Sequence, residues 1–121
     1  MKAVIDSDVL IDYLQGSDRA RVELDLYDDL RYSILSWMEV MCGADTESEK
    51  EAAGLLFNSM KRVELNKGIA QKAVIFRKTL RLKLPDAIIL ATADEEGCIL
   101  VTRNTGDFGT SDPRIRVPYS S

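Results

Sequence analysis

Short apolar runs alternate with longer segments that are apolar on one side along most of the chain. The short runs predict strands at residues 2–5, 32–35, 63–65, 98–102 and 115–117. Helical spacing of apolar residues predicts helices at 9–14, 19–30, 36–43, 47–60, 69–80 and 85–96. Strands separated by helices are typical of an α/β fold with a central, mostly parallel sheet. Such sheets bind ligands outside the carboxyl ends of their strands.

The composition is that of one globular domain covering residues 1–121. The chain is 45% hydrophobic and 30% charged, and its Gly and Pro residues do not cluster as a linker. No run approaches the ~18 apolar residues of a membrane span, and the N-terminus has no signal-peptide layout, so we expect a cytoplasmic protein with no membrane contact. The spacing of Cys42 and Cys98 fits neither redox nor zinc chemistry, and we expect buried thiols.

The sequence contains no histidine. This excludes Ser-His-Asp and Cys-His catalysis, zinc sites built on histidine, and RNA cleavage by a pair of histidines. Hydrolytic chemistry in this chain must therefore use carboxylates, hydroxyls or lysines.

Charge is segregated along the chain, although the net charge is only −4. Residues 1–60 hold 5 Lys/Arg against 13 Asp/Glu, residues 61–83 hold 8 against 1, and residues 84–121 hold 3 against 6. The middle segment could contact phosphates, with Arg77, Lys78 and Arg81 on one helical flank. The alternative is a solvated helix surface.

Acidic residues follow several predicted strands or begin the helices after them. Asp6 directly follows the first strand, Glu39 lies in the helix after the second, Asp86 begins a late helix, and Asn104 and Asp107 follow the fourth strand. Each alone has an ordinary interpretation as a helix cap or a solvated side chain. Together they predict one acidic pocket, since these loops meet at one edge of the sheet. Clustered carboxylates need a cation, and oxygen ligands suit Mg²⁺ or Mn²⁺ and metal-assisted phosphodiester hydrolysis.

Four blocks of sequence resemble the PIN-domain toxins of the VapC type. The blocks are DSDVLIDYL at 6–14, SWME at 36–39, LPDAIILATA at 84–93 and LVTRNTGDF at 100–108. They occur in the order and spacing of that family and span nearly the whole chain. The resemblance implies a three-layer α/β/α PIN-like fold and a Mg²⁺- or Mn²⁺-dependent endoribonuclease. It also implies the toxin component of a type II toxin-antitoxin system, which cleaves RNA and so inhibits translation and growth.

The resemblance also implies the site residues. Asp6, Glu39 and Asp86 match the three most regular acids of the family. PIN domains often have a fourth acid where this chain has Asn104, and we expect Asp107 to substitute for it. Asp6, Asp86 and Asp107 would hold the metal, and Glu39 would ligate it or orient the attacking water.

Other residues are implied in supporting roles. Thr102 and Asn104 would orient neighbouring carboxylates or the attacking water, and Asp8 lies near the site or caps a helix. Arg103 would join Arg77, Lys78 and Arg81 in contacting the RNA backbone. Attack in line should leave a 5′-phosphate and a 3′-hydroxyl.

The family's partners follow from the same resemblance. Similar chains form homodimers and are inhibited by a small VapB-type antitoxin whose tail covers the acidic groove, so DNA would be met only through the antitoxin. The candidates for this contact or for the dimer seam are Leu24, Tyr27, Trp37, Met38 and Met41. The alternative for these side chains is ordinary core packing.

Three other functions are open to this sequence. A haloacid-dehalogenase-like phosphatase could use Asp6 and Asp8, but the required later Lys and acidic pair are poorly matched. A phospho-receiver domain needs an Asp after its third strand, and residues 63–66 provide none. A catalytically inactive PIN module that only binds is the third, and retention of the three regular acids argues against it.

Overall fold

The five predicted strands are present and form one all-parallel sheet in the order β3-β2-β1-β4-β5. The computed structural model describes residues 1–109 and 111–120. The strands are β1 (Lys2–Ile5), β2 (Asp29–Ser33), β3 (Lys61–Val63), β4 (Ile99–Val101) and β5 (Ile115–Arg116). The predicted α/β class with a central parallel sheet is confirmed.

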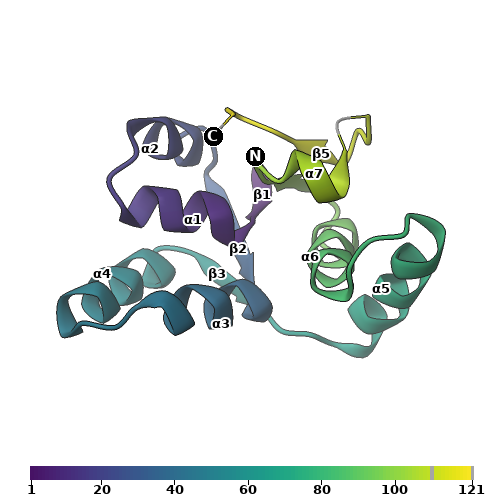
Figure 1. The fold of residues 1–121 in the computed structure, drawn as a ribbon, viewed down its shortest axis with the longest axis horizontal. Helices are drawn as coiled ribbons and strands as arrows, with labels where there is room; N and C mark the ends of the chain where they lie inside the picture. Colours follow the sequence, from purple (N-terminus) through teal and green to yellow (C-terminus); the bar gives the residue numbers. More distant parts are fainter. Residues whose placement is uncertain (110, 121) are drawn as a thin grey trace.

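Helices cover both faces of this sheet, which gives the three-layer α/β/α arrangement (Figure 1). They are α1 (Ser7–Leu14), α2 (Asp18–Leu24), α3 (Ile34–Gly43), α4 (Glu47–Asn58), α5 (Lys67–Thr79), α6 (Leu84–Glu95) and α7 (Thr105–Phe108). α1, α2 and α4 pack on one face and α5 and α6 on the other, while α3 contacts both sides. None of the helices in the described ranges is long and apolar enough to cross a membrane.

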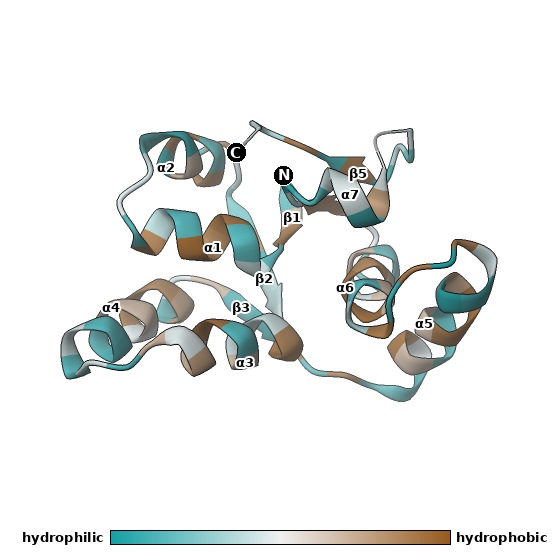
Figure 2. Cartoon of the chain, viewed as in Figure 1, coloured by the Kyte–Doolittle hydropathy of each residue, from teal (hydrophilic) through white to brown (hydrophobic). Residues whose placement is uncertain are grey.

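Alternation of side chains along β1 separates two hydrophobic clusters. Ala3 and Ile5 point to the cluster under α1, α2 and α4, and Val4 points to the cluster under α5 and α6. All three side chains are fully buried. Figure 2 shows the consequence for the helices: α6 is largely hydrophobic, whereas the outer end of α4 is hydrophilic.

Two element boundaries differ from the prediction, and at the second of them a helix cap overrides the hydrophobic spacing. The helix predicted at 19–30 ends at Leu24, and Asp29 already begins β2. Leu26, which the helical pattern included, is more than half exposed. The next helix, α3, begins at Ile34, because the hydroxyl of Ser33 accepts a hydrogen bond from the Leu35 N–H.

Three further expectations need correction. β3 occupies residues 61–63, two residues before the predicted position. The single-turn helix α7 was not expected, because four residues are too few to show a helical period. Cys42 is exposed and Cys98 half-buried, so the expectation of two buried thiols is wrong.

A buried carboxylate fixes the C-terminal strand to the rest of the molecule. Glu23 on α2 is 4% exposed. It accepts hydrogen bonds from Arg116 Nε at 2.6 Å and Nη2 at 2.8 Å, and from the Tyr27 hydroxyl at 2.6 Å. These bonds, led by that from Arg116, hold the pKa of Glu23 below its usual value. β5 lies at the sheet edge and has only two residues, so this network adds side-chain contacts to its short backbone pairing with β4.

We expect Glu23→Gln to destabilise the protein by about 2–3 kcal/mol, because it leaves Arg116 without its buried partner. The pKa of Glu23 is lower in the folded than in the unfolded state. Its contribution is therefore present above about pH 4.3 and is lost as the pH falls through the folded pKa. Urea unfolding at pH 7 and at pH 3 measures both effects.

Glu51→Gln is the matched control, because Glu51 is an exposed carboxylate on α4. Its free energy of unfolding should stay within about 0.5 kcal/mol of that of the unmodified protein. Equal effects of the two substitutions would contradict a structural role for Glu23.

Candidate active site

The strand order places a ligand crevice between β1 and β4. The chain leaves these adjacent strands toward different neighbours, and such a switch point opens a crevice at the carboxyl ends. Asp6 follows β1 and Thr102 follows β4. A pocket of about 370 Å³ lies there, which we call the acidic pocket. It is lined by Asp6, Ser7, Asp8, Glu39, Pro85, Asp86, Ile89, Arg103, Asn104, Thr105 and Gly106.

Asp6 is the most buried carboxylate of the acidic pocket, at 5% exposure. Its oxygens accept hydrogen bonds from the Ser7 N–H at 2.7 Å and from the Thr102 hydroxyl at 2.8 Å. These donors are neutral. Burial, with the neighbouring charge of Asp8, outweighs these hydrogen bonds and raises the pKa of Asp6 to about 7. The site therefore holds a carboxylate that lacks a compensating positive charge.

Asp8 lies in the first turn of α1 and contacts the same supports. Its Oδ2 accepts a hydrogen bond from the Arg103 N–H at 3.2 Å and lies 3.2 Å from Thr102 Oγ1. Burial raises the pKa of Asp8. The residue at the N-cap of α1 is Asp6, so the expected alternative of Asp8 as a helix cap is wrong, and Asp8 lines the pocket from inside the helix.

Glu39 reaches the pocket from α3 and is linked to Asp6 through Ser7. The Ser7 hydroxyl lies 3.4 Å from Asp6 Oδ1 and 3.3 Å from Glu39 Oε1. Sequence reasoning missed this bridge, although Ser7 lies inside the first quoted block. Glu39 is otherwise exposed, and its carboxylate can turn toward a ligand at low cost.

Asp86 and Asp107 approach each other from α6 and α7. Pro85 starts α6, which places Asp86 in its first turn. Burial, together with the hydrogen-bonded Asp107 carboxylate, raises the pKa of Asp86 to about 6. The hydrogen bond from Asn104 Nδ2 at 2.9 Å is the main cause of the lowered pKa of Asp107.

Asn104 and Asp107 divide the expected fourth position between them. Asn104 lines the acidic pocket, and its Oδ1 caps α7 by accepting a hydrogen bond from the Asp107 N–H at 3.2 Å. Asp107 does not line the acidic pocket. Its carboxylate contacts Asp86 from outside the pocket and lies 3.9 Å from Lys83 Nζ. Asp107 therefore reaches the site only through Asp86, and Asn104 holds it there.

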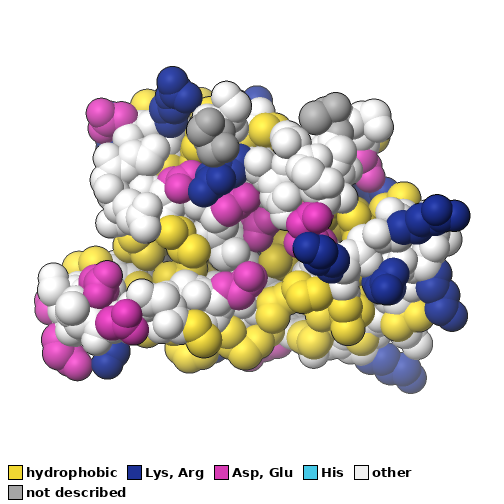
Figure 3. Space-filling view, viewed as in Figure 1, with side chains coloured by type: hydrophobic (Ala, Val, Ile, Leu, Met, Phe, Trp, Pro, Cys, Tyr) yellow, Lys and Arg dark blue, Asp and Glu magenta, His cyan; other side chains and the backbone are white. Residues whose placement is uncertain are grey.

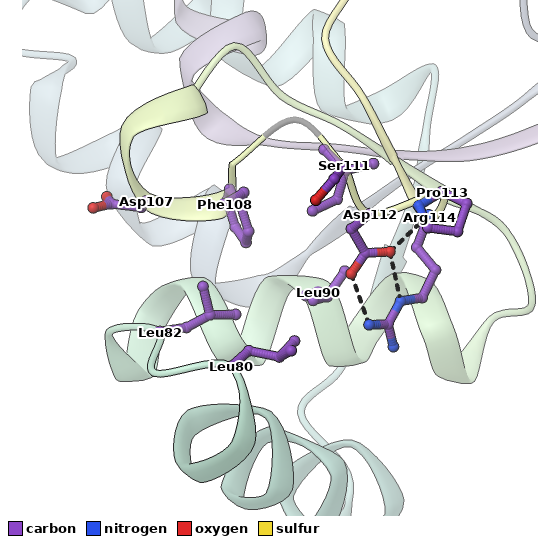
Figure 4. Close-up of a pocket in the computed structure, with 10 residues that line it drawn as sticks. Leu80, Leu82, Leu90, Asp107, Phe108, Ser111, Asp112, Pro113 and Arg114 are labelled. Atoms are coloured by element: carbon purple, nitrogen blue, oxygen red, sulfur yellow. Dashed lines mark hydrogen bonds and ion pairs between the residues drawn. The ribbon is translucent and has the colours of Figure 1, made fainter.

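A larger cavity of about 630 Å³ adjoins Asp107 on the other side of α7. Figure 4 shows Leu80, Leu82 and Leu90 along one side and Phe108 facing them from α7. The Asp107 side chain points away from these leucines. This cavity is mainly apolar, so the charged chemistry belongs to the smaller acidic pocket.

The predicted RNA-contacting cations occupy two different settings. Arg77, Lys78 and Arg81 are exposed, and none forms an ion pair within the described residues. α5 ends at Thr79 and Arg81 has a left-handed φ of 55°, so the expected shared helical flank is wrong for Arg81. Figure 3 shows Lys and Arg gathered over α5, beside the central group of Asp and Glu side chains.

Arg103 lines the acidic pocket, but its guanidinium is bound to Asp12 on α1. Arg103 Nε lies 2.7 Å from Asp12 Oδ2 and Nη2 lies 3.2 Å from Asp12 Oδ1. The Tyr119 hydroxyl donates to Asp12 Oδ2 at 2.8 Å. Sequence reasoning identified Arg103 but missed Asp12 and Tyr119 as its partners.

The candidates for a partner surface divide between core and surface. Leu24 and Tyr27 are buried beneath α1 and α4, so their proposed place in a contact surface is wrong. Trp37 and Met41 are half-buried against the same cluster, and the guanidinium of Arg62 lies 5.4 Å from the Trp37 ring centroid. Met38 is the most exposed of the five, at 44%.

The donor chemistry of the acidic pocket fits a hard divalent cation. Carboxylate oxygens with hydroxyl and amide oxygens are the ligands that Mg²⁺ and Mn²⁺ prefer. Asp6, Glu39 and Asp86 have no Lys or Arg ion-pair partner in the ranges 1–109 and 111–120. Over the same residues, no three acidic or cysteine side chains are already gathered closely enough to hold an ion. A bound cation would have to draw these carboxylates together.

Comparison with solved structures finds close structural relatives. One chain of a toxin-antitoxin complex from Klebsiella pneumoniae is 35% identical and superimposes with a TM-score of 0.92, covering 98% of this chain and 99% of that one. VapBC2 from Rickettsia felis, bound to a promoter DNA fragment, gives a TM-score of 0.81 at 16% identity, covering 95% and 96% of the two chains. DNA-bound VapBC from Salmonella typhimurium gives 0.77 at 19% identity, covering 96% of each.

A family model matches the sequence, whereas comparison with curated proteins gives no match. The family model described as PIN domain matches residues 3–109, which include all four blocks of the sequence resemblance and every residue of the acidic pocket. This match and the Klebsiella relative confirm the predicted resemblance, and the chain belongs to the PIN-domain family.

Proposed function

We propose that this protein is a Mg²⁺- or Mn²⁺-dependent endoribonuclease, the toxin of a type II toxin-antitoxin pair. The observation that carries the proposal is the acidic pocket, which Asp6, Glu39 and Asp86 line from three elements without a Lys or Arg ion-pair partner among the described residues. The family match supports a nuclease, and the Klebsiella relative, a chain of a toxin-antitoxin complex, supports a toxin.

Each acid has a role that follows from its position. Asp6 and Asp86 would hold the cation, since burial disfavours their charge until a cation compensates it. Glu39 is exposed, and its side chain is hydrogen-bonded to Ser7, so it is placed to ligate the cation or to orient the attacking water. Asp107 would complete the set through Asp86, with Asn104 holding it. The divalent cation would activate water and stabilise charge on the phosphodiester oxygens.

Supporting residues keep these acids in place. The Thr102 hydroxyl, fully buried at the end of β4, fixes Asp6 and lies beside Asp8. Asp8 adds negative charge, with its Oδ2 held by the Arg103 N–H. Cleavage by water activated in this way would leave a 5′-phosphate and a 3′-hydroxyl, with no covalent intermediate on the protein.

We infer the partners from the same assignment. An RNA backbone would contact Arg77, Lys78 and Arg81 beside the pocket, and Arg103 at its wall. We propose a VapB-type antitoxin as inhibitor, a homodimer as the assembly, and contact with DNA only through the antitoxin. The whole chain would act as a single PIN domain in the cytoplasm, where the RNA substrate is found.

The first prediction from the proposed function concerns RNA cleavage itself. Purified, antitoxin-free protein incubated with total cellular RNA should give discrete cuts with 5′-phosphate ends in Mg²⁺ or Mn²⁺ and none in EDTA. Asp6→Asn and Asp86→Asn should each slow cleavage about 100-fold or more, a loss of about 3 kcal/mol of transition-state stabilisation. Mapping of RNA ends by sequencing measures both.

Asp45→Asn is the matched control, because Asp45 is an exposed carboxylate outside the acidic pocket. The Asp45→Asn variant should cleave RNA at the rate of the unmodified protein. If folded protein supplied with either metal leaves every RNA intact, the chain is a binding-only PIN module and the proposed activity is wrong.

The second prediction is a pH dependence of metal binding. Asp6 and Asp86 have pKa values of about 7 and about 6, so protons compete with the cation below these values. Both values lie above the roughly 3.9 of an unfolded Asp, so the metal-free folded state binds more protons. These two groups therefore lower its stability as the pH rises from about 4 to about 7. Mg²⁺ should raise the melting temperature more at pH 8 than at pH 5.5.

Asp6→Asn tests the contribution of Asp6 both to the stability of the metal-free protein and to metal binding. It removes the uncompensated charge, so the metal-free variant should be more stable than the unmodified protein at pH 8, by roughly 2 kcal/mol. It should also lose most of the Mg²⁺ shift. A metal-free Asp6→Asn variant that melts lower at pH 8 would show that Asp6 stabilises the fold, contrary to this account.

The third prediction concerns the exposed cations near α5. The triple variant Arg77→Gln, Lys78→Gln, Arg81→Asn should bind single-stranded RNA more weakly. The slope of log K against log salt should fall by about 0.7 for each phosphate that the variant no longer neutralises. Asn is chosen at 81 because it tolerates the left-handed backbone there. Fluorescence anisotropy in EDTA, which prevents cleavage, gives the affinities.

The matched control removes three cations elsewhere: Arg19→Gln, Arg21→Gln and Lys50→Gln on α2 and α4. Equal losses of affinity in the two triple variants would mean that only net charge matters. That result would reject a specific RNA track at residues 77–81.

A further inference from the structure

The cation nearest the acidic pocket is held by a carboxylate outside it. Arg103 follows Thr102 directly and lines the pocket, yet its guanidinium makes two bonds to Asp12, at 2.7 and 3.2 Å. Asp12 does not line the pocket. A paired, bidentate contact of this kind fixes a guanidinium in one orientation.

Tyr119 completes this arrangement from the C-terminal segment. Its hydroxyl donates to the Asp12 oxygen that also accepts from Arg103 Nε, at 2.8 Å. Burial opposes ionisation of Asp12, but the hydrogen bonds from Arg103 and Tyr119 outweigh it and lower the pKa of Asp12. Asp12 is therefore ionised at neutral pH, and both of its oxygens accept hydrogen bonds from these two side chains. We call Asp12, Arg103 and Tyr119 the tether.

The tether lies one helical turn from the pocket. Asp8 and Asp12 are four residues apart on α1, so they share one helix face about 5–6 Å apart. The Arg103 N–H already donates to Asp8 Oδ2 at 3.2 Å. A guanidinium freed from Asp12 would find Asp8 as its next carboxylate on that face, and there it would stand among the groups that are to receive a divalent cation.

We propose that Asp12, held by Tyr119, is a positioning residue that keeps the Arg103 guanidinium out of the acidic pocket. The pocket thus retains its unpaired negative charge, and Arg103 remains at its wall. Without Asp12, Arg103 is an internal competitor of the divalent cation. This inference rests on the proposed function only in requiring that the acidic pocket binds such a cation.

The test is a double-mutant cycle on Mn²⁺ affinity, read from the electron paramagnetic resonance signal of free Mn²⁺, without RNA. Asp12→Asn should weaken binding about tenfold when Arg103 is present. With Arg103→Gln in place, the same substitution should cost less than about twofold, because no guanidinium remains to enter the pocket. This non-additivity separates the tether from the loss of one nearby negative charge, which acts equally in both backgrounds.

Tyr119→Phe is the charge-neutral second variant. It removes one hydrogen bond to Asp12 and should weaken Mn²⁺ binding about two- to threefold, again only when Arg103 is present. Asp18→Asn, which removes an exposed carboxylate from α2, should leave the affinity unchanged. Melting curves confirm that each variant is folded.

Three results would overturn the tether. They are an unchanged affinity in Asp12→Asn, an equal loss with and without Arg103→Gln, and an effect of Tyr119→Phe that persists without Arg103. In each of these, the unmodified protein still binds Mn²⁺, so the proposed metal dependence survives. If the unmodified protein binds no Mn²⁺, the metal-dependent function and the tether are both rejected.

Discussion

The structure depends on one costly placement: the Asp6 carboxylate, 5% exposed, at the carboxyl end of the central strand. Among the described residues its hydrogen-bond donors are neutral, namely the Ser7 N–H and hydroxyl and the Thr102 hydroxyl, and they do not offset its burial. A group of this kind persists only when the surrounding fold supplies the stability to hold it. Here that stability comes from two hydrophobic clusters that bury β1 from both faces.

The ion pairs of the molecule are arranged so that this charge stays uncompensated. Glu23 binds Arg116 and Lys72 binds Asp94 and Glu95, all outside the acidic pocket, while Arg103 at the pocket wall binds Asp12. None of these pairs includes the carboxylate of Asp6, Glu39 or Asp86. The net charge of −4 therefore says little about the site, whose local field is set by which carboxylates remain unpaired.

The sequence predicted the features that depend on local pattern. β1 and the acid after it are recognisable because a short apolar run ends in a carboxylate, and Pro85 with Asp86 is a typical helix start. The same kind of pattern also gave a wrong helix end. Hydrophobic residues past Leu24 favoured a longer α2, whereas Tyr27 lies after the end of the helix and is buried there. A helix of one turn shows no hydrophobic periodicity, so α7 could not be predicted. The contact between Asn104 and Asp107 is therefore seen only in the structure, where Asn104 caps α7.

Contacts between distant parts of the sequence were beyond prediction. Asp12 and Tyr119 are 107 residues apart, and no spacing rule joins them. The Ser7 bridge to Glu39 likewise depends on how α1 packs against α3. The acids that line the pocket could thus be named from the sequence, and so could Thr102 as a support for them. The Ser7 bridge and the pairing of Arg103 with Asp12 could not, because they become visible only once parallel strands bring β1 and β4 together.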